Sequence, residues 1–78
     1  MMSEVEWLEE FRINLLRMMD EDRITQKELA DDSGLSEASI SYYVNGTKMP
    51  GVRAIVNLAY ALDCSTDDLI DFGEMIEG

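Results

Sequence analysis

Side chains that could act as acids, bases, nucleophiles or metal ligands are unevenly represented in this chain of 78 residues. Asp and Glu number 17, whereas cysteine occurs once, as Cys64, and histidine is absent. The commonest general base and metal ligand is therefore missing, and one thiol forms neither an intrachain disulfide nor a thiolate cluster. Acid pairs such as Glu9 and Glu10 diverge on a helix and have no nucleophile beside them. We expect no enzymatic activity, no cofactor and no metal ion.

Aspartates near the C-terminus are a second group with the right chemistry for a cation site. They are Asp63, Asp67, Asp68 and Asp71. Their spacing lacks the alternation and the central glycine of a calcium-binding loop. Acids in such positions are typical of a solvated surface and of helix N-termini, where they oppose the positive end of the helix dipole. We therefore expect these residues to cap and solvate a helix.

Net charge restricts the partners that this chain can bind. Lys and Arg number 6 against 17 acids, so the formal net charge is −11. A surface this acidic does not attract nucleic acid or an anionic membrane as a whole. The charge is uneven, however: residues 1–22 carry −5 and residues 63–78 carry −6, whereas residues 23–62 are neutral. Contact with a polyanion is therefore expected only from the middle of the chain.

The composition predicts one folded, cytoplasmic domain over residues 1–78. Hydrophobic residues make up 46% of the chain, which is typical of a protein with a core. The first residues are acidic where a signal peptide would be basic, and a single thiol suits a reducing compartment. The most apolar stretch, Ala54 to Leu62, is far shorter than the ~20 residues that span a bilayer. No membrane association is expected.

Helix-start signals divide the chain into five segments. Capping boxes, in which a hydroxyl precedes an acid by three residues, occur at Ser3, Thr25 and Ser65, and Ser36 is a further N-cap. Apolar residues then recur at helical spacing, and no segment shows the period-two alternation of a strand. The predicted helices cover about 4–19, 25–32, 36–45 and 52–62, with a fifth from residue 65 that carries Leu69, Ile70, Phe72, Met75 and Ile76. These elements predict a compact all-α domain.

Residues 25–46 contain the most specific pattern. Two short helices that cross at a tight turn need a small residue at the crossing, and Ala30 is placed for this. The turn needs a residue that tolerates positive φ, which Gly34 supplies. Ile40 provides an apolar contact from the second helix, and Tyr43 also faces inward. This spacing predicts a helix-turn-helix.

The same residues resemble the phage repressor/Cro family of DNA-binding domains, also described as lambda-repressor-like or XRE-type. The matching motifs are Thr25-Gln26-Lys27-Glu28-Leu29-Ala30, Gly34-Leu35-Ser36, Ile40-Ser41 and Asn45-Gly46-Thr47-Lys48-Met49-Pro50. Residues 58–69 resemble the fourth helix of that family and the start of its fifth, so the resemblance covers roughly residues 8–70. It implies a five-helix fold with the helix-turn-helix at the second and third helices.

The resemblance also implies which side chains meet DNA. Base edges in the major groove would be read by Glu37, Ala38, Ser39 and Tyr42. Phosphates would be held by Gln26, Lys27, Ser41, Asn45, Gly46, Thr47 and Lys48. These types suit the task, since short polar or apolar side chains read base edges, and amides, hydroxyls and lysines bind phosphates.

Three positions depart from the family pattern. Glu37 stands where a basic residue is frequent, Val44 where Glu is frequent, and Ser33 where an apolar residue is usual. Residues 36–44 contain no Lys or Arg, so this helix cannot make the bidentate Arg–guanine contact. Glu37 is left to accept from a cytosine amine, and Ala38 or Tyr42 to contact a thymine methyl.

We expect a homodimeric, operator-binding repressor of transcription from a phage, mobile element or bacterium. The acidic surface favours an alternative: a helix-turn-helix antitoxin, or an interaction module that binds a protein partner through its termini. Some apolar residues exceed what so small a core covers and, flanked by acids, are expected at a dimer or partner surface. They are Trp7, Phe72, Met75 and Ile76.

Overall fold

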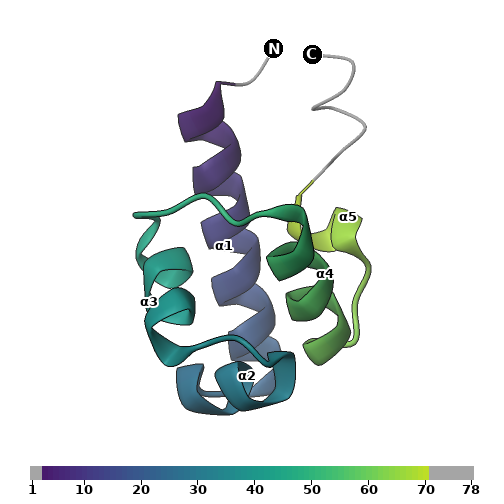
Figure 1. Ribbon diagram of the computed structural model, residues 1–78. Helices are drawn as coiled ribbons and strands as arrows, with labels where there is room; N and C mark the ends of the chain where they lie inside the picture. Colours follow the sequence, from purple (N-terminus) through teal and green to yellow (C-terminus); the bar gives the residue numbers. More distant parts are fainter. Residues whose placement is uncertain (1–2, 71–78) are drawn as a thin grey trace.

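The computed structural model describes residues 3–70, which form five helices joined by short connections (Figure 1). The helices are α1 Glu4–Asp22, α2 Gln26–Ser33, α3 Glu37–Asn45, α4 Val52–Ala61 and α5 Thr66–Leu69. α1 runs through the middle of the molecule, with α3 on one side and α4 and α5 on the other, and α2 lies near its C-terminal end (Figure 1). For the described residues, this confirms the predicted all-α fold with the helix-turn-helix at α2 and α3.

Side-chain caps determine where the helices begin. At α2 the backbone N–H of Glu28 donates to Thr25 Oγ1 (3.1 Å), and the N–H of Thr25 donates to Glu28 Oε1 (3.0 Å). Ser3 and Glu6 form the same reciprocal pair at α1. At α3, Ser36 accepts from the N–H of Ser39 at 3.0 Å. Each cap satisfies backbone donors that have no partner within the helix, so the sequence signals locate these helix starts correctly.

The core lies where all five helices meet. Its fully buried large side chains are Phe11, Leu15, Leu29, Ile40, Leu58, Leu69 and Ile70. Each such burial stabilises the fold by about 1.5–3 kcal/mol relative to exposure. Tyr43 faces inward, and its ring meets Phe11 edge-on, with 5.9 Å between the ring centroids. The amide of Asn14 donates to the carbonyl oxygen of Leu69 at 2.9 Å, which ties α1 to α5.

Some expectations about the helices require correction. α1 continues to Asp22 rather than ending near Met19, because the chain keeps helical geometry until Arg23 adopts a left-handed conformation (φ 54°). Val5, although in step with the apolar pattern, is 76% exposed because the first turn of α1 extends past the core. Val52 and Val56 of α4 are also exposed. α5 is shorter than expected: it ends at Leu69, because Ile70 adopts an extended backbone conformation (φ −138°). Phe72, Met75 and Ile76 lie outside the described residues.

Two further expectations concern metals and membranes. In residues 3–70 no group of three or more His, Cys, Asp or Glu side chains could hold a metal ion. Asp71, the last of the four C-terminal aspartates, lies outside this range. No helix of the described range is both long and apolar enough to cross a membrane.

Candidate nucleic-acid interface

The turn between α2 and α3 has the geometry that its sequence predicts. Ala30 and Ile40 are buried at the crossing of the two helices. Gly34 ends α2 in the left-handed conformation (φ 75°), and its N–H donates to the carbonyl of Ala30. This conformation is strained for residues with a side chain, which explains the glycine. The turn thereby holds α3 at a defined angle to α2.

Ser33 replaces the usual apolar residue without leaving an unpaired polar atom. It is 8% exposed. Its hydroxyl donates to the carbonyl oxygen of Ala30 and accepts from the N–H of Leu35, both at 3.3 Å. Because a buried hydroxyl is costly only when it lacks partners, the serine is tolerated and also closes the turn.

The outer face of α3 presents the side chains expected to read bases. Glu37 and Ala38 are exposed, and Tyr42 is 48% exposed while its neighbour Tyr43 faces the core. Ser39 is different: it is half-buried, and its hydroxyl accepts from the Ser36 hydroxyl at 2.9 Å. Three of the four predicted base-reading residues are therefore exposed on α3, whereas the hydroxyl of Ser39 is engaged with the Ser36 cap.

Several of the predicted phosphate-binding groups lie in the second half of α3 and in the loop that follows it. Gly46 ends the helix in the left-handed conformation (φ 70°). Thr47 then folds back, and both its N–H (3.0 Å) and its hydroxyl (3.2 Å) donate to the carbonyl oxygen of Tyr42. The amide of Asn45 donates to the Ser41 hydroxyl at 3.3 Å. These contacts order the loop beside the exposed face of α3.

Lys48 connects this loop to the reading face. Its Nζ lies 5.6 Å from the centre of the Tyr42 ring, in a cation–π contact. Such contacts at exposed sites stabilise by about 0.5–1 kcal/mol. A positive charge is thus held above an aromatic side chain on α3. Gln26 and Lys27 are exposed in the first turn of α2, and within residues 3–70 no hydrogen bond or ion pair joins them to α3.

Arg12 is a basic residue near this loop that the sequence patterns do not indicate. A Cβ on Gly46 would lie 3.0 Å from Cδ of Arg12, so the arginine runs along the glycine. The guanidinium donates to Glu9 through Nη2 (2.6 Å) and Nε (3.0 Å), and this hydrogen bonding lowers the pKa of Glu9. Only the tertiary contact between α1 and α3 brings Arg12 here, so no local sequence signal could have found it.

The interface coincides with a gap in the distribution of acids. From residue 38 to residue 62 the chain has no Asp or Glu, and it carries two basic residues, Lys48 and Arg53. This range includes almost all of α3, the following loop and α4. A phosphate backbone lying along α3 and its loop would therefore meet the part of the molecule that repels it least.

The short second and third helices, their glycine turn and the exposed polar face of α3 define a helix-turn-helix DNA-binding domain. A sequence model of the family described as "Cro/C1-type HTH DNA-binding domain" matches residues 14–74. The chain belongs to this family.

Sequence and structure comparisons agree with this assignment. The HTH-type transcriptional regulator YqaE of Bacillus subtilis (strain 168) is 28% identical over 60 residues, which cover 77% of this chain and 52% of the regulator. The chain thus spans about half the length of that relative.

Two solved structures have the same fold. The restriction-modification controller protein C.AhdI from Aeromonas hydrophila superposes with a TM-score of 0.77 at 27% identity, covering 81% of this chain and 96% of C.AhdI. A mutant of the restriction-modification controller protein C.Esp1396I superposes with a TM-score of 0.74 at 22% identity, covering 99% and 92% of the two chains. At that identity the second likeness establishes the fold alone.

Proposed function

We propose that this protein is a homodimeric repressor of transcription that binds a two-fold symmetric operator through α3. The observation that carries the proposal is the exposed face of α3, which continues into a loop of hydroxyl, amide and lysine groups within the acid-free residues 38–62. A major groove admits one such helix. The likeness to a transcriptional regulator and to a restriction-modification controller protein supports a regulatory role.

Sequence is read by Glu37, Ala38 and Tyr42 in this proposal. Glu37 at the start of α3 accepts from the amine of a cytosine, and Ala38 or the Tyr42 ring contacts a thymine methyl. Ser39 contributes less, because its hydroxyl is already engaged with the Ser36 cap. A half-site that contains C and T at these positions is the expected result.

Phosphates are held by groups that flank α3 on both sides. The set comprises Gln26, Lys27, Ser41, Asn45, Gly46, Thr47, Lys48 and, from the structure, Arg12. With about three basic side chains per protomer each neutralising one phosphate, the log–log salt dependence of a dimer has a slope of about −5. Non-specific binding is therefore weak, and affinity depends on fit to the operator.

A homodimer supplies the second reading helix. Two α3 helices related by a two-fold axis read half-sites about 34 Å apart on one face of the duplex. We place the protein in the cytoplasm, without catalytic activity. Capture of a toxin or another protein by the acidic termini remains a prediction, since residues 71–78 lie outside the described range.

Selection from random duplex DNA by the purified protein tests this function. At low and moderate salt we expect recovery of a two-fold symmetric sequence that retains binding as the salt concentration rises. Recovery of an asymmetric site would overturn the homodimer, and recovery of nothing at low salt would overturn operator binding. In the second case the acidic field prevails, and a protein partner becomes the better hypothesis.

A further inference from the structure

The side chain of Arg12 crosses the glycine that ends α3. A Cβ added to Gly46 would lie 3.0 Å from Cδ, 3.7 Å from Nε and 4.0 Å from Cγ of Arg12, so the arginine runs along the backbone of this residue. Gly46 also begins the loop that the proposed function places along a phosphate strand. The packing of α1 against α3 therefore brings a guanidinium from outside the helix-turn-helix to that loop.

The hydrogen-bond donors of this loop are largely engaged within the protein. The backbone N–H groups of Gly46 (3.2 Å) and Thr47 (3.0 Å) and the hydroxyl of Thr47 (3.2 Å) all donate to carbonyl oxygens of the last turn of α3. A loop in this condition attracts a phosphate mainly through the positive charge beside it. Lys48, within the loop, and Arg12, from α1, bring that charge.

Glu9 holds the guanidinium of Arg12 in the way that a phosphate would hold it. Nη2 lies 2.6 Å from Oε1 and Nε lies 3.0 Å from Oε2, so two hydrogen bonds join the two groups side by side. A phosphate offers an arginine the same pair of oxygens as a carboxylate does. The side chains of Arg12 and Glu9 are 31% and 53% exposed, and ion pairs this exposed add little to stability. Exchange of one anion for the other therefore disturbs the fold little.

We propose that Arg12 passes from Glu9 to a DNA phosphate beside Gly46 when the operator binds, and that Glu9 thereby limits the affinity for DNA. A phosphate that takes over Arg12 lies close to the carboxylate of Glu9, and the two negative charges repel each other. Glu9 is thus an internal competitor of DNA. It weakens binding to every sequence, so that only complexes with many further contacts persist.

This exchange rests on the proposed operator binding, and Glu9→Gln is its first test. The amide keeps the size of the side chain and removes the charge that competes with DNA. The salt slope should steepen by about 0.9 per protomer, which corresponds to a gain in affinity of about eightfold at 0.1 M salt. Fluorescence anisotropy titrations measure both quantities, with the operator recovered from random DNA and with a duplex of random sequence. We expect similar gains on the two duplexes, since phosphates are common to both.

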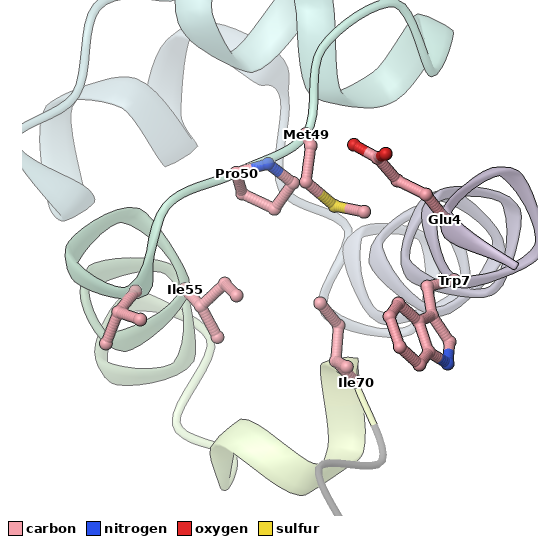
Figure 2. A pocket seen from close by; sticks show the side chains of 7 residues that line it. Glu4, Trp7, Met49, Pro50, Ile55 and Ile70 are labelled. Atoms are coloured by element: carbon pink, nitrogen blue, oxygen red, sulfur yellow. The ribbon is translucent and has the colours of Figure 1, made fainter. Parts of the chain in front are cut away.

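Glu4→Gln is the matched control, because it removes the same charge from the same helix. Glu4 and Met49 line one pocket, and Figure 2 shows the carboxylate of Glu4 directed toward Met49, so this acid also lies near the segment that follows α3. Arg12 forms its ion pair with Glu9, however, and not with Glu4. Glu4→Gln should therefore give a smaller gain in affinity. Equal gains in the two variants would show that net charge alone sets the affinity, and would overturn the exchange.

The gain in affinity should also depend on Arg12. In an Arg12→Gln background, Glu9→Gln no longer frees a guanidinium, so its effect should fall to that of Glu4→Gln. Arg12→Gln alone should weaken binding to both duplexes more than Arg17→Gln, which removes an exposed charge from the same helix. Additive effects of Glu9→Gln and Arg12→Gln would contradict the exchange. Helical circular dichroism establishes that the variants fold.

NMR spectroscopy of the arginine Nε–H groups separates failure of this inference from failure of the proposed function. Without DNA, Glu9→Gln should shift the resonance of Arg12, which establishes the ion pair in solution. Addition of the operator to the native protein should shift the same resonance and leave that of Arg17 in place. An operator that binds without moving the Arg12 resonance would overturn the exchange and leave operator binding intact. A protein that binds neither duplex would overturn both.

Discussion

α2 and α3 are two short helices with the same kinds of caps but with differently charged outer surfaces. Both begin at a hydroxyl N-cap and end at a glycine in the left-handed conformation. α2 carries the acids Glu28, Asp31 and Asp32 on an exposed surface, whereas α3 carries a single acid, Glu37, in its first turn. The similarity of the caps shows that helix formation does not account for the difference.

The outer surfaces of the two helices therefore reflect what each must face. Acids on α2 are compatible with solvent and with a packed inner face formed by Leu29 and Ala30. In the proposed function α3 must tolerate a polyanion along its outer face, and its side chains there are short, neutral or aromatic after the first turn. Charge, more than helix propensity, distinguishes α2 from α3.

Adding an acid to α3 should remove this difference and have the largest effect on DNA binding. We expect Ala38→Glu to weaken operator binding by about 100-fold, because a carboxylate would be buried against the groove without a donor. Val5→Glu is the matched control: it adds the same charge at a position on α1 that is 76% exposed, and affinity should change little. Affinity for the operator is measured by fluorescence anisotropy titration. Equal losses of affinity in the two variants would mean that operator binding depends on the net charge of the protein and not on the position of the added acid.

Removing the lysine held over Tyr42 should have the next largest effect. Lys48→Ala is expected to weaken binding to every sequence by about tenfold and to reduce the salt slope by about 0.9 for each phosphate that is no longer neutralised. Arg17→Ala, which removes an exposed charge from α1, serves as the control and should leave the slope unchanged. A Lys48→Ala protein with an unchanged slope but altered sequence preference would assign Lys48 to base reading.

Local signals predicted most of this fold, since they act over a few residues. The reciprocal hydrogen bonds of Thr25 and Glu28, and the left-handed glycines at 34 and 46, depend on neighbours along the chain. The burial of Ile40 and Tyr43 followed from helical spacing. These features could be predicted from the sequence because the interactions that cause them lie within single helices and turns.

Features that depend on packing between helices could not be predicted in this way. Arg12 reaches Gly46 only because α1 packs beside α3. Val52 and Val56 match the apolar pattern of α4 but lie on its outer side. A periodic pattern shows that a helix has apolar positions; it does not show how wide a face the rest of the protein covers.

The two glycine caps should respond differently to the same substitution. Gly34→Ala and Gly46→Ala both place a Cβ on a left-handed residue, and each should cost about 1 kcal/mol in the free energy of unfolding. Gly34 has nothing within 4 Å of that Cβ, whereas at Gly46 it would press on Arg12 at 3.0 Å. Urea denaturation should therefore show a larger loss for Gly46→Ala, and Arg12→Ala should relieve the additional part. Equal losses in the two variants would mean that Arg12 moves aside freely.

The N-caps of the two helices should differ in their response to pH, which is the smallest effect. Hydrogen bonding from Thr25 lowers the pKa of Glu28 below its ordinary value. The ionised Glu28 therefore stabilises the folded protein at neutral pH, and this stabilisation is lost as the pH falls through the pKa that Glu28 has in the folded state. α3 has Ser39 in the equivalent position, whose hydroxyl does not titrate in this range. Thermal unfolding should therefore show Glu28→Gln less stable than the native protein at pH 7 and converging with it at acid pH. Ser39→Ala should keep a constant difference over the same range, and convergence there too would point to a general acid effect unrelated to the cap.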